Sequence, residues 1–240
     1  MEFGGIKALD DVSFSVPKGS ITSLIGPNGA GKTTLINIIT GVLSPTRGEL
    51  WFDGQPLRQR KPHQVAAIGI RRTFQTVRLF NGLSVRENLL IGRFRNLLGS
   101  GWRDLLLPMF VGDRAGRRRA DEILQMFDLA HLADEIATDL PYGTQRRVEI
   151  ARALMGAPRF ALLDEPAAGM NEQETAQLVQ DVRRIRDEGI TVFLVEHDMA
   201  MVMSVSNKVV VLNFGRKIAE GTPAEVQADP EVIASYLGEQ

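Results

Sequence analysis

Residues 26–34 read Gly26-Pro27-Asn28-Gly29-Ala30-Gly31-Lys32-Thr33-Thr34. This stretch matches the pattern G-x-x-x-x-G-K-[ST] of a phosphate-binding loop. An apolar run at residues 21–25 predicts a buried strand before it, and a helical pattern at residues 32–43 follows it. Because strand, loop and helix occur in the order that the motif requires, a glycine-rich turn without a ligand is the weaker interpretation.

The residue types in this loop are those that phosphate binding needs. The glycines let the backbone wrap closely around an anion with its N–H groups turned inward. The helix that begins at Lys32 adds the positive end of its dipole, and the Lys32 ammonium can reach the outer phosphates. The Thr33 hydroxyl is placed to ligate Mg²⁺, which joins the β- and γ-phosphates. We therefore predict that ATP and Mg²⁺ bind at Gly26, Pro27, Asn28, Gly29, Ala30, Gly31, Lys32, Thr33 and Thr34.

A second motif is the apolar run at residues 160–163, which ends in the adjacent carboxylates Asp164 and Glu165. Neighbouring side chains on a strand point in different directions, so one carboxylate can hold a metal ion while the other handles water. We assign Asp164 to the Mg²⁺ shell and Glu165 to the general base or water-orienting role in hydrolysis. A solvated strand end is the plain alternative, and the phosphate loop in the same chain counts against it.

The two ends of the chain predict an α/β core. Strand patterns at residues 21–25, 160–163 and 191–195, with helical patterns at 32–43 and 172–188, predict a mostly parallel sheet covered on both faces. Alternating apolar residues predict a half-exposed strand at 11–16 in an antiparallel β part, and residues 209–219 predict a hairpin.

The middle of the chain has a different character, because helical patterns at residues 85–91, 121–129 and 145–155 replace the strand signals. We predict one domain of residues 1–240. Residues 1–75 and 158–240 form its nucleotide-binding core, and residues 76–157 form an inserted helical subdomain. Residues 94–120 mix glycine, apolar and basic residues without a clear period and give no structural prediction.

The composition is that of an ordinary globular chain and excludes several classes of protein. Hydrophobic residues make up 44% of the 240 residues and charged residues 24%, and the net charge of −1 gives no general attraction to nucleic acid. The absence of cysteine excludes disulfides and thiolate metal sites. The apolar runs are far shorter than the roughly 20 residues that span a bilayer. We expect a cytoplasmic protein, soluble when isolated, that serves a membrane only as a docked subunit.

Taken in order, the motifs resemble those of the ABC (ATP-binding cassette) ATPases, and the resemblance covers nearly the whole chain. It implies that Gln75 is the Q-loop glutamine, which contacts Mg²⁺ and takes part in catalysis. It also implies that His197 is the switch histidine and that Phe3 stacks on adenine. Considered alone, Gln75 and His197 would each be a solvated or locally hydrogen-bonded side chain. The signature segment that acts on a second subunit is Leu140, Pro141, Tyr142, Gly143, Thr144 and Gln145.

Within this family the chain most resembles the branched-chain amino acid importer ATPases, in particular the type with the longer helical subdomain. The resemblance rests on residues 3–5, 72–75, 165–171 and 234–239. It implies a peripheral subunit on the cytoplasmic face of the cell or inner membrane, bound to membrane-spanning permease subunits. A second ATPase subunit, identical or different, completes a head-to-tail ATP sandwich. An exporter, or an importer of another solute such as urea or amides, stays open as an alternative.

The signature departs from the family's usual Leu-Ser-Gly-Gly-Gln, because Pro141 replaces the serine and Thr144 the glutamine. Proline has neither a hydroxyl nor an N–H to donate. We therefore expect the nucleotide site completed by this signature to be weaker than the site on the chain's own phosphate loop. The start also departs, because only two residues precede Phe3 where the family generally has another strand. Either the chain is trimmed or its true start lies upstream, and we expect the adenine platform to be poorly anchored.

Of three rival functions, two are weaker and one stays open. An ABC ATPase acting on DNA or ribosomes predicts a coiled-coil insertion or a second cassette, and the basic run at residues 114–119 reads better as a solvated helix start than as a nucleic-acid patch. A GTPase would need Asn-Lys-x-Asp, whereas residues 207–210 read Asn-Lys-Val-Val. An exporter ATPase cannot be distinguished from an importer ATPase by the sequence of the ATP-hydrolysing subunit alone. We expect residues 76–110 to dock on the membrane subunits, with an internally packed subdomain as an equal alternative.

Overall fold

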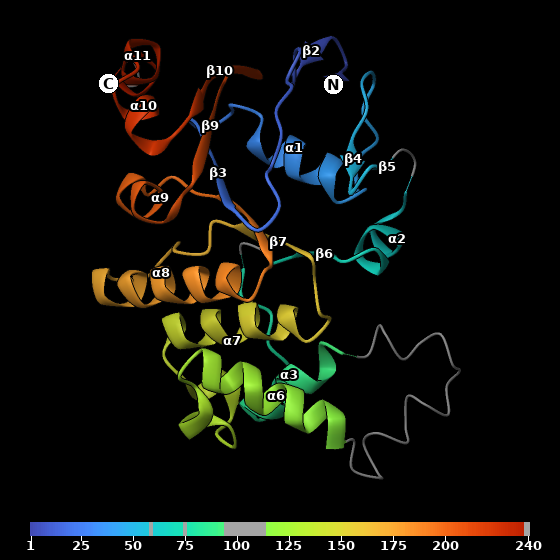
Figure 1. Ribbon diagram of the computed structural model, residues 1–240, viewed down its shortest axis with the longest axis vertical. Helices are drawn as coiled ribbons and strands as arrows, with labels where there is room; N and C mark the ends of the chain where they lie inside the picture. The colour runs from blue at the N-terminus through green and yellow to red at the C-terminus, as the bar shows by residue number, and fades with distance from the viewer. Residues whose placement is uncertain (58–59, 74–75, 94–113, 238–240) are drawn as a thin grey trace.

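The computed structural model describes residues 1–57, 60–73, 76–93 and 114–237, and a six-stranded sheet forms its centre (Figure 1). Its strand order is β10-β9-β3-β8-β7-β6, and only β10 runs antiparallel to its neighbour. The strands are β3 (Ile21–Ile25), β6 (Ile70–Arg72), β7 (Phe160–Asp164), β8 (Thr191–Val195), β9 (Lys208–Asn213) and β10 (Arg216–Gly221). The predicted mostly parallel sheet and the C-terminal hairpin are confirmed.

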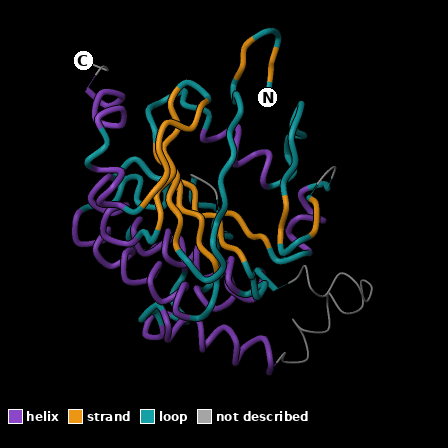
Figure 2. Tube along the Cα trace, turned by 45° about the horizontal axis from the view of Figure 1, so that its top comes forward, coloured by secondary structure: helices purple, strands orange, loops and turns teal. Residues whose placement is uncertain are grey.

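The central strands β3, β7 and β8 are buried at every position because the sheet is covered on both faces. Alternate residues along each strand pack against different layers, so Leu162 and Phe193 face helix α1, whereas Leu163 and Leu194 face helices α7 and α8. Figure 2 shows the strands gathered in the middle of the molecule with helices along them. Two faces thus carry separate hydrophobic clusters.

The helices predicted at residues 32–43, 85–91, 121–129, 145–155 and 172–188 are all present, most of them with different ends, whereas the helices at residues 62–67 and 199–205 were not predicted. The described helices are α1 (Lys32–Ile39), α2 (Pro62–Ala67), α3 (Val85–Ile91), α6 (Arg114–Met126), α7 (Tyr142–Leu154), α8 (Glu172–Asp187), α9 (Met199–Val205), α10 (Pro223–Gln227) and α11 (Pro230–Leu237). The prediction for residues 32–43 is too long, because Gly41 has a φ of +73° and ends the helix. The basic run at residues 114–119 lies in an exposed first part of α6.

Two short antiparallel sheets flank the main one, formed by β1 (Glu2–Phe3) with β2 (Ile6–Lys7) and by β4 (Trp51–Phe52) with β5 (Gln55–Pro56). The prediction of a strand at residues 11–16 is wrong, because the segment joins no backbone ladder. Its apolar residues are half-buried in alternation as expected. Lysine side chains hold it instead: Lys217 Nζ donates to Ser13 O at 2.6 Å and Lys208 Nζ to Ser15 O at 2.8 Å.

The N-terminal segment is better anchored than the sequence suggests. The carbonyl of Met1 accepts hydrogen bonds from the backbone N–H groups of Ala8 (2.9 Å) and Leu9 (3.2 Å). These bonds close the base of the β1–β2 hairpin, so the expectation of a poorly anchored segment around Phe3 is wrong at this point. The Phe3 side chain itself stays 45% exposed.

A buried ion pair joins helices α7 and α8. Arg147 of α7 donates two hydrogen bonds to the Asp181 carboxylate of α8, at 2.6 and 3.2 Å, and Asp181 is fully buried. Burial raises the pKa of Asp181, and the hydrogen bonds and charge of Arg147 oppose that rise.

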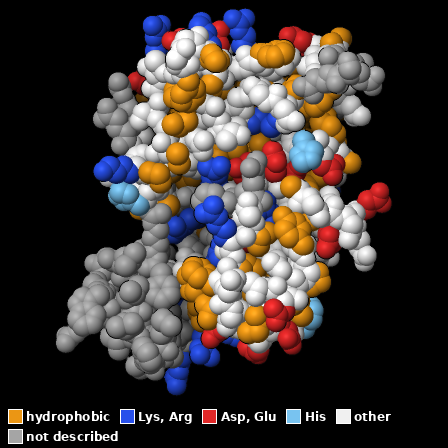
Figure 3. Space-filling model, turned by 180° about the vertical axis from the view of Figure 1, so that it is seen from behind, with side chains coloured by type: hydrophobic (Ala, Val, Ile, Leu, Met, Phe, Trp, Pro, Cys, Tyr) orange, Lys and Arg blue, Asp and Glu red, His pale blue; other side chains and the backbone are white. Residues whose placement is uncertain are grey.

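On the surface shown in Figure 3, basic and acidic side chains are interspersed instead of gathering in one basic stripe.

Replacement of Phe193 by alanine tests the packing of the sheet. Its ring lies between Phe14 and Phe160, with centroid separations of 5.9 and 6.2 Å. We predict that Phe193→Ala lowers the free energy of unfolding in urea by about 3–5 kcal/mol. The control Phe214→Ala removes a ring that is 86% exposed and should change it by about 0.5 kcal/mol or less. Equal losses in both variants would contradict this packing.

Candidate nucleotide-binding and catalytic site

The phosphate loop lies between the carboxyl end of β3 and the first turn of α1. Gly26 and Gly31 have φ values of +150° and +102°, which glycine adopts without strain. A Cβ atom on Gly26 would lie 2.1 Å from the carbonyl oxygen of Leu212, and one on Gly31 would lie 2.7 Å from that of Ala8. The glycines are thus required for the close approach of β9 and the N-terminal segment to the loop.

Lys32 is the first residue of α1 and is buried. Its ammonium folds back over the loop and donates to the carbonyls of Gly26 and Pro27, the latter at 2.9 Å. Asn28, Gly29 and Thr33 are exposed beside it. A cation, an exposed glycine-rich loop and the start of a helix therefore meet at one point, which is the chemistry that binds phosphate.

Asp164 ends β7, and its side chain is 3% exposed. Arg72, at the end of the neighbouring strand β6, donates to Asp164 Oδ2 at 2.8 Å and to Asn37 Oδ1 of α1 at 2.9 Å. Arg72 thereby fixes the carboxylate relative to the helix that follows the phosphate loop. The sequence reasoning missed Arg72, for which the only signal was a charged residue at the end of a short strand.

Mg²⁺ favours hard oxygen ligands, keeps several waters and takes few of its ligands from protein. The Thr33 hydroxyl and the Asp164 carboxylate are ligands of this kind. Among the described residues no cluster of three or more His, Cys, Asp or Glu forms a metal cage. The site thus fits a metal ion held jointly with phosphates.

Glu165 follows directly and is half-buried. Its φ of +45° is unusual for a residue other than glycine. The backbone there is held on two sides: the Glu165 N–H donates to Val195 O at 2.8 Å, and the Glu165 carbonyl accepts from Arg146 Nη2 at 2.9 Å. Sequence reasoning missed this role of Arg146, which has the pattern of an ordinary charged helix residue but is fully buried.

His197 follows β8, and its side chain is 64% exposed. The residue before it, Glu196, is fully buried and accepts backbone hydrogen bonds from Ala167, His197 and Asp198. Burial raises the pKa of Glu196, and these three hydrogen bonds oppose the rise. The sequence reasoning also missed Glu196, although a carboxylate at the end of an apolar strand is a signal that could have found it.

The sheet brings most of the predicted residues to one edge. β3, β8 and β7 are consecutive neighbours and run parallel, so the phosphate loop, His197, Asp164 and Glu165 all follow carboxyl ends on that edge. The hairpin that carries Phe3 adjoins the loop through Ala8, beside Gly31. Gln75 lies outside the described residues.

The signature segment lies elsewhere, at the start of α7. Pro141 is the residue before the first helical turn and offers no side-chain cap. The Gln145 amide donates to the carbonyls of Thr138 (3.0 Å) and Leu140 (2.8 Å), which fixes the turn, while the Tyr142 ring is 43% exposed. α7 packs on the sheet face opposite to α1, the helix that follows the chain's own phosphate loop.

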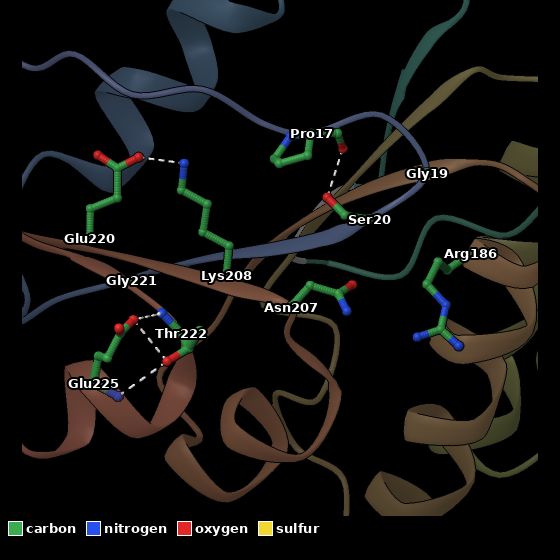
Figure 4. Close-up of a pocket in the computed structure, with 10 residues that line it drawn as sticks. All are labelled: Pro17, Gly19, Ser20, Arg186, Asn207, Lys208, Glu220, Gly221, Thr222 and Glu225. Carbon is green, nitrogen blue, oxygen red and sulfur yellow. Dashed lines mark hydrogen bonds and ion pairs between the residues drawn. The ribbon is translucent and has the colours of Figure 1, made fainter.

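An open cavity of about 850 Å³ lies at the other end of the sheet (Figure 4). Ser20 and Asn207, which line it, precede β3 and β9, whereas the phosphate loop follows β3. Its charged groups have partners: Lys208 pairs with Glu220, Glu225 accepts from Thr222, and Arg186 pairs with Asp187 outside the lining. This cavity is therefore separate from the nucleotide site.

Comparisons with known proteins agree with this geometry. Residues 9–168 match the ABC transporter family, and residues 216–240 match a family described as branched-chain amino acid ATP-binding cassette transporter. The chain is 43% identical, over 100% of its length and 95% of the relative, to the high-affinity branched-chain amino acid transport ATP-binding protein BraF of Pseudomonas aeruginosa.

Solved structures agree as well. The ADP conformation of the ATP-binding cassette MJ1267 superposes with a TM-score of 0.87 at 36% identity, over 100% of this chain and 96% of the other. The dimeric structure of the bacterial cassette MJ0796 gives a TM-score of 0.74 at 28% identity, over 91% of each chain. In the described parts of this chain, no helix is long and apolar enough to cross a membrane. The fold, the phosphate loop with its carboxylate pair, and these matches together show that the chain belongs to the ABC transporter family, as an ATP-binding cassette.

Proposed function

We propose that this chain is the ATP-hydrolysing subunit of an importer for branched-chain or related amino acids. The observation that carries the enzymatic part is the convergence of the phosphate loop, Glu165 and His197 at the carboxyl ends of three adjacent strands. The solute class rests on the relatives, since BraF carries branched-chain amino acid transport in its name. The two halves of the proposal thus have separate support.

In this proposal the phosphate loop and Lys32 bind the phosphates, and Thr33, Asp164 and Gln75 hold Mg²⁺. When bound, the metal ion neutralises charge that develops on the phosphates. Glu165 accepts the proton of the attacking water, and His197 contacts the γ-phosphate after a change of rotamer that its exposure permits. Phe3 stacks on the adenine from the β1–β2 hairpin. Residues 1–75 and 158–240 act as the nucleotide-binding core, and residues 76–157 act as the helical subdomain.

A second cassette is needed to complete the site. The dimeric structure of MJ0796 shows that cassettes of this family pair. α7 and α1 pack on opposite faces of the sheet, and a helix N-terminus attracts negative charge, so we infer that the start of α7 meets phosphate on a partner. We infer a head-to-tail pair with a second ATPase subunit, identical or different, bound to permease subunits on the cytoplasmic face of the membrane.

Glu165→Gln is the sharpest test of the catalytic role. It keeps the size of the side chain but removes the proton acceptor, so we predict retained MgATP binding and hydrolysis slower by roughly 10² or more. Glu172→Gln, a matched change at an exposed position on the first turn of α8, should leave hydrolysis unchanged. Near-normal turnover in Glu165→Gln would assign the base to another residue.

The surface around Phe80 is our proposed contact with the permease. The Phe80 ring is 48% exposed and lies 5.6 Å from the Arg152 guanidinium. The buried Asn88 holds the loop in place by accepting from the Phe80 N–H at 2.8 Å and donating to the Phe80 carbonyl at 3.3 Å. An aromatic side chain presented on a fixed loop is suited to a protein interface. Other residues expected there, at 94–110, lie outside the described part of the chain.

Crosslinking tests this contact, because the chain contains no cysteine. We predict that Phe80→Cys in the assembled transporter forms a thiol crosslink to a membrane subunit. Ile233→Cys, at an exposed apolar residue of α11, is the matched control and should not. Absence of a Phe80 crosslink in a transport-active complex would place the docking surface elsewhere.

A further inference from the structure

Two buried charges of opposite sign hold the backbone that carries Glu165. From α7, the Arg146 guanidinium donates to the carbonyls of Asp164 (3.1 Å), Glu165 (2.9 Å) and Pro166 (3.2 Å). From the end of β8, Glu196 Oε1 accepts from the Ala167 N–H at 2.7 Å. Both charged side chains are fully buried. Arg146 therefore binds the carbonyls of residues 164–166, and Glu196 binds the N–H of the next residue, Ala167.

The same Glu196 carboxylate also fixes the loop of His197. Its second oxygen, Oε2, accepts from the backbone N–H groups of His197 (3.0 Å) and Asp198 (3.4 Å). Asp198 in turn accepts from Met201 N–H at 3.0 Å and so caps α9. One side chain thus joins the segment after Glu165 to the segment that carries His197, with one oxygen on each.

This arrangement requires a carboxylate. Three N–H donors converge on its two oxygens, and such charge-assisted bonds offset the cost of burying the charge. A glutamine in the same place would have one acceptor oxygen and would turn an NH₂ donor towards at least one of the N–H groups. Glu165, with its φ of +45°, sits in a conformation that persists only where its surroundings hold it.

We propose that Glu196 is a positioning residue for ATP hydrolysis, which keeps Glu165 and His197 in a fixed relation so that both reach the same γ-phosphate and attacking water. The proposal rests on the proposed function, because Glu196 acts through Glu165 and His197 and takes no part in binding nucleotide. Small displacements of reacting groups are costly, since about 1 Å can slow a reaction by about 10²-fold. Loss of the Glu196 bonds should therefore lower the catalytic rate and leave MgATP affinity unchanged.

The test uses the assembled transport complex, with single-turnover hydrolysis and MgATP affinity measured for each variant. Glu196→Gln should slow hydrolysis by about 10- to 100-fold with unchanged affinity. Glu196→Asp keeps the charge but is one methylene shorter, so it should give an intermediate rate, and it serves if the glutamine variant fails to fold. The control Asp181→Asn neutralises a buried carboxylate away from both loops and should slow hydrolysis less than either.

A combined variant separates positioning from general damage. Because Glu196 acts through Glu165 and His197, Glu196→Gln should slow hydrolysis little further when Glu165→Gln and His197→Ala are both present, whereas Asp181→Asn should have the same small effect in both backgrounds. A full further slowing by Glu196→Gln in that background, or slowing in the otherwise unchanged chain no greater than that of Asp181→Asn, would overturn the inference. Normal hydrolysis by Glu165→Gln alone would instead refute the base role in the proposed function.

Discussion

Parallel pairing of β3, β8 and β7 is the constraint on which the rest of the site depends. Because the three strands are neighbours with the same direction, the loops that follow them emerge at one edge of the sheet. A strand reversed or displaced by one place would separate the phosphate loop from Glu165. The strands can be parallel because both faces are covered, by α1 on one side and by α7 and α8 on the other.

Hydrogen bonds between residues far apart in the sequence hold the individual site residues in place at this edge of the sheet. Arg72 orients Asp164, Arg146 binds the carbonyls around Glu165, and Glu196 joins that segment to the loop of His197. Each is a charged side chain that is buried or nearly buried and bonded to backbone or to an opposite charge, which is the only way a charge is tolerated there. Arg146 also belongs to α7, whose first turn carries the signature. The proposed contacts of the signature with a second subunit and the position of Glu165 therefore depend on the same helix.

The sequence alone predicted the parts of this site that depend on local patterns. The phosphate loop, the carboxylate pair and the three central strands follow from glycine spacing and apolar runs, and the structure has the strands at the predicted residues. Arg146 could not be predicted in the same way, because its neighbour Arg147 has the same local pattern and different partners. Which of the two arginines faces the backbone of residues 164–166 depends on how α7 packs on β7. The alternation of apolar and polar residues at 11–16 correctly indicated a half-buried face, but it did not indicate backbone pairing in a sheet. The same pattern also suits a segment that lysine side chains hold in place.

We propose that the phosphate loop of this chain is half of a nucleotide site and that its signature completes the site on the other subunit. The most direct measurement is ATP turnover at a single site after Pro141→Ser, with one phosphate loop of the pair disabled by replacing its lysine with alanine. A serine there restores a hydroxyl and an N–H at the start of α7. We predict faster turnover at the site on the partner's phosphate loop, measured with Lys32→Ala in this chain, and unchanged turnover at the chain's own loop. Faster turnover at the chain's own phosphate loop, with unchanged turnover at the partner's loop, would contradict this proposal.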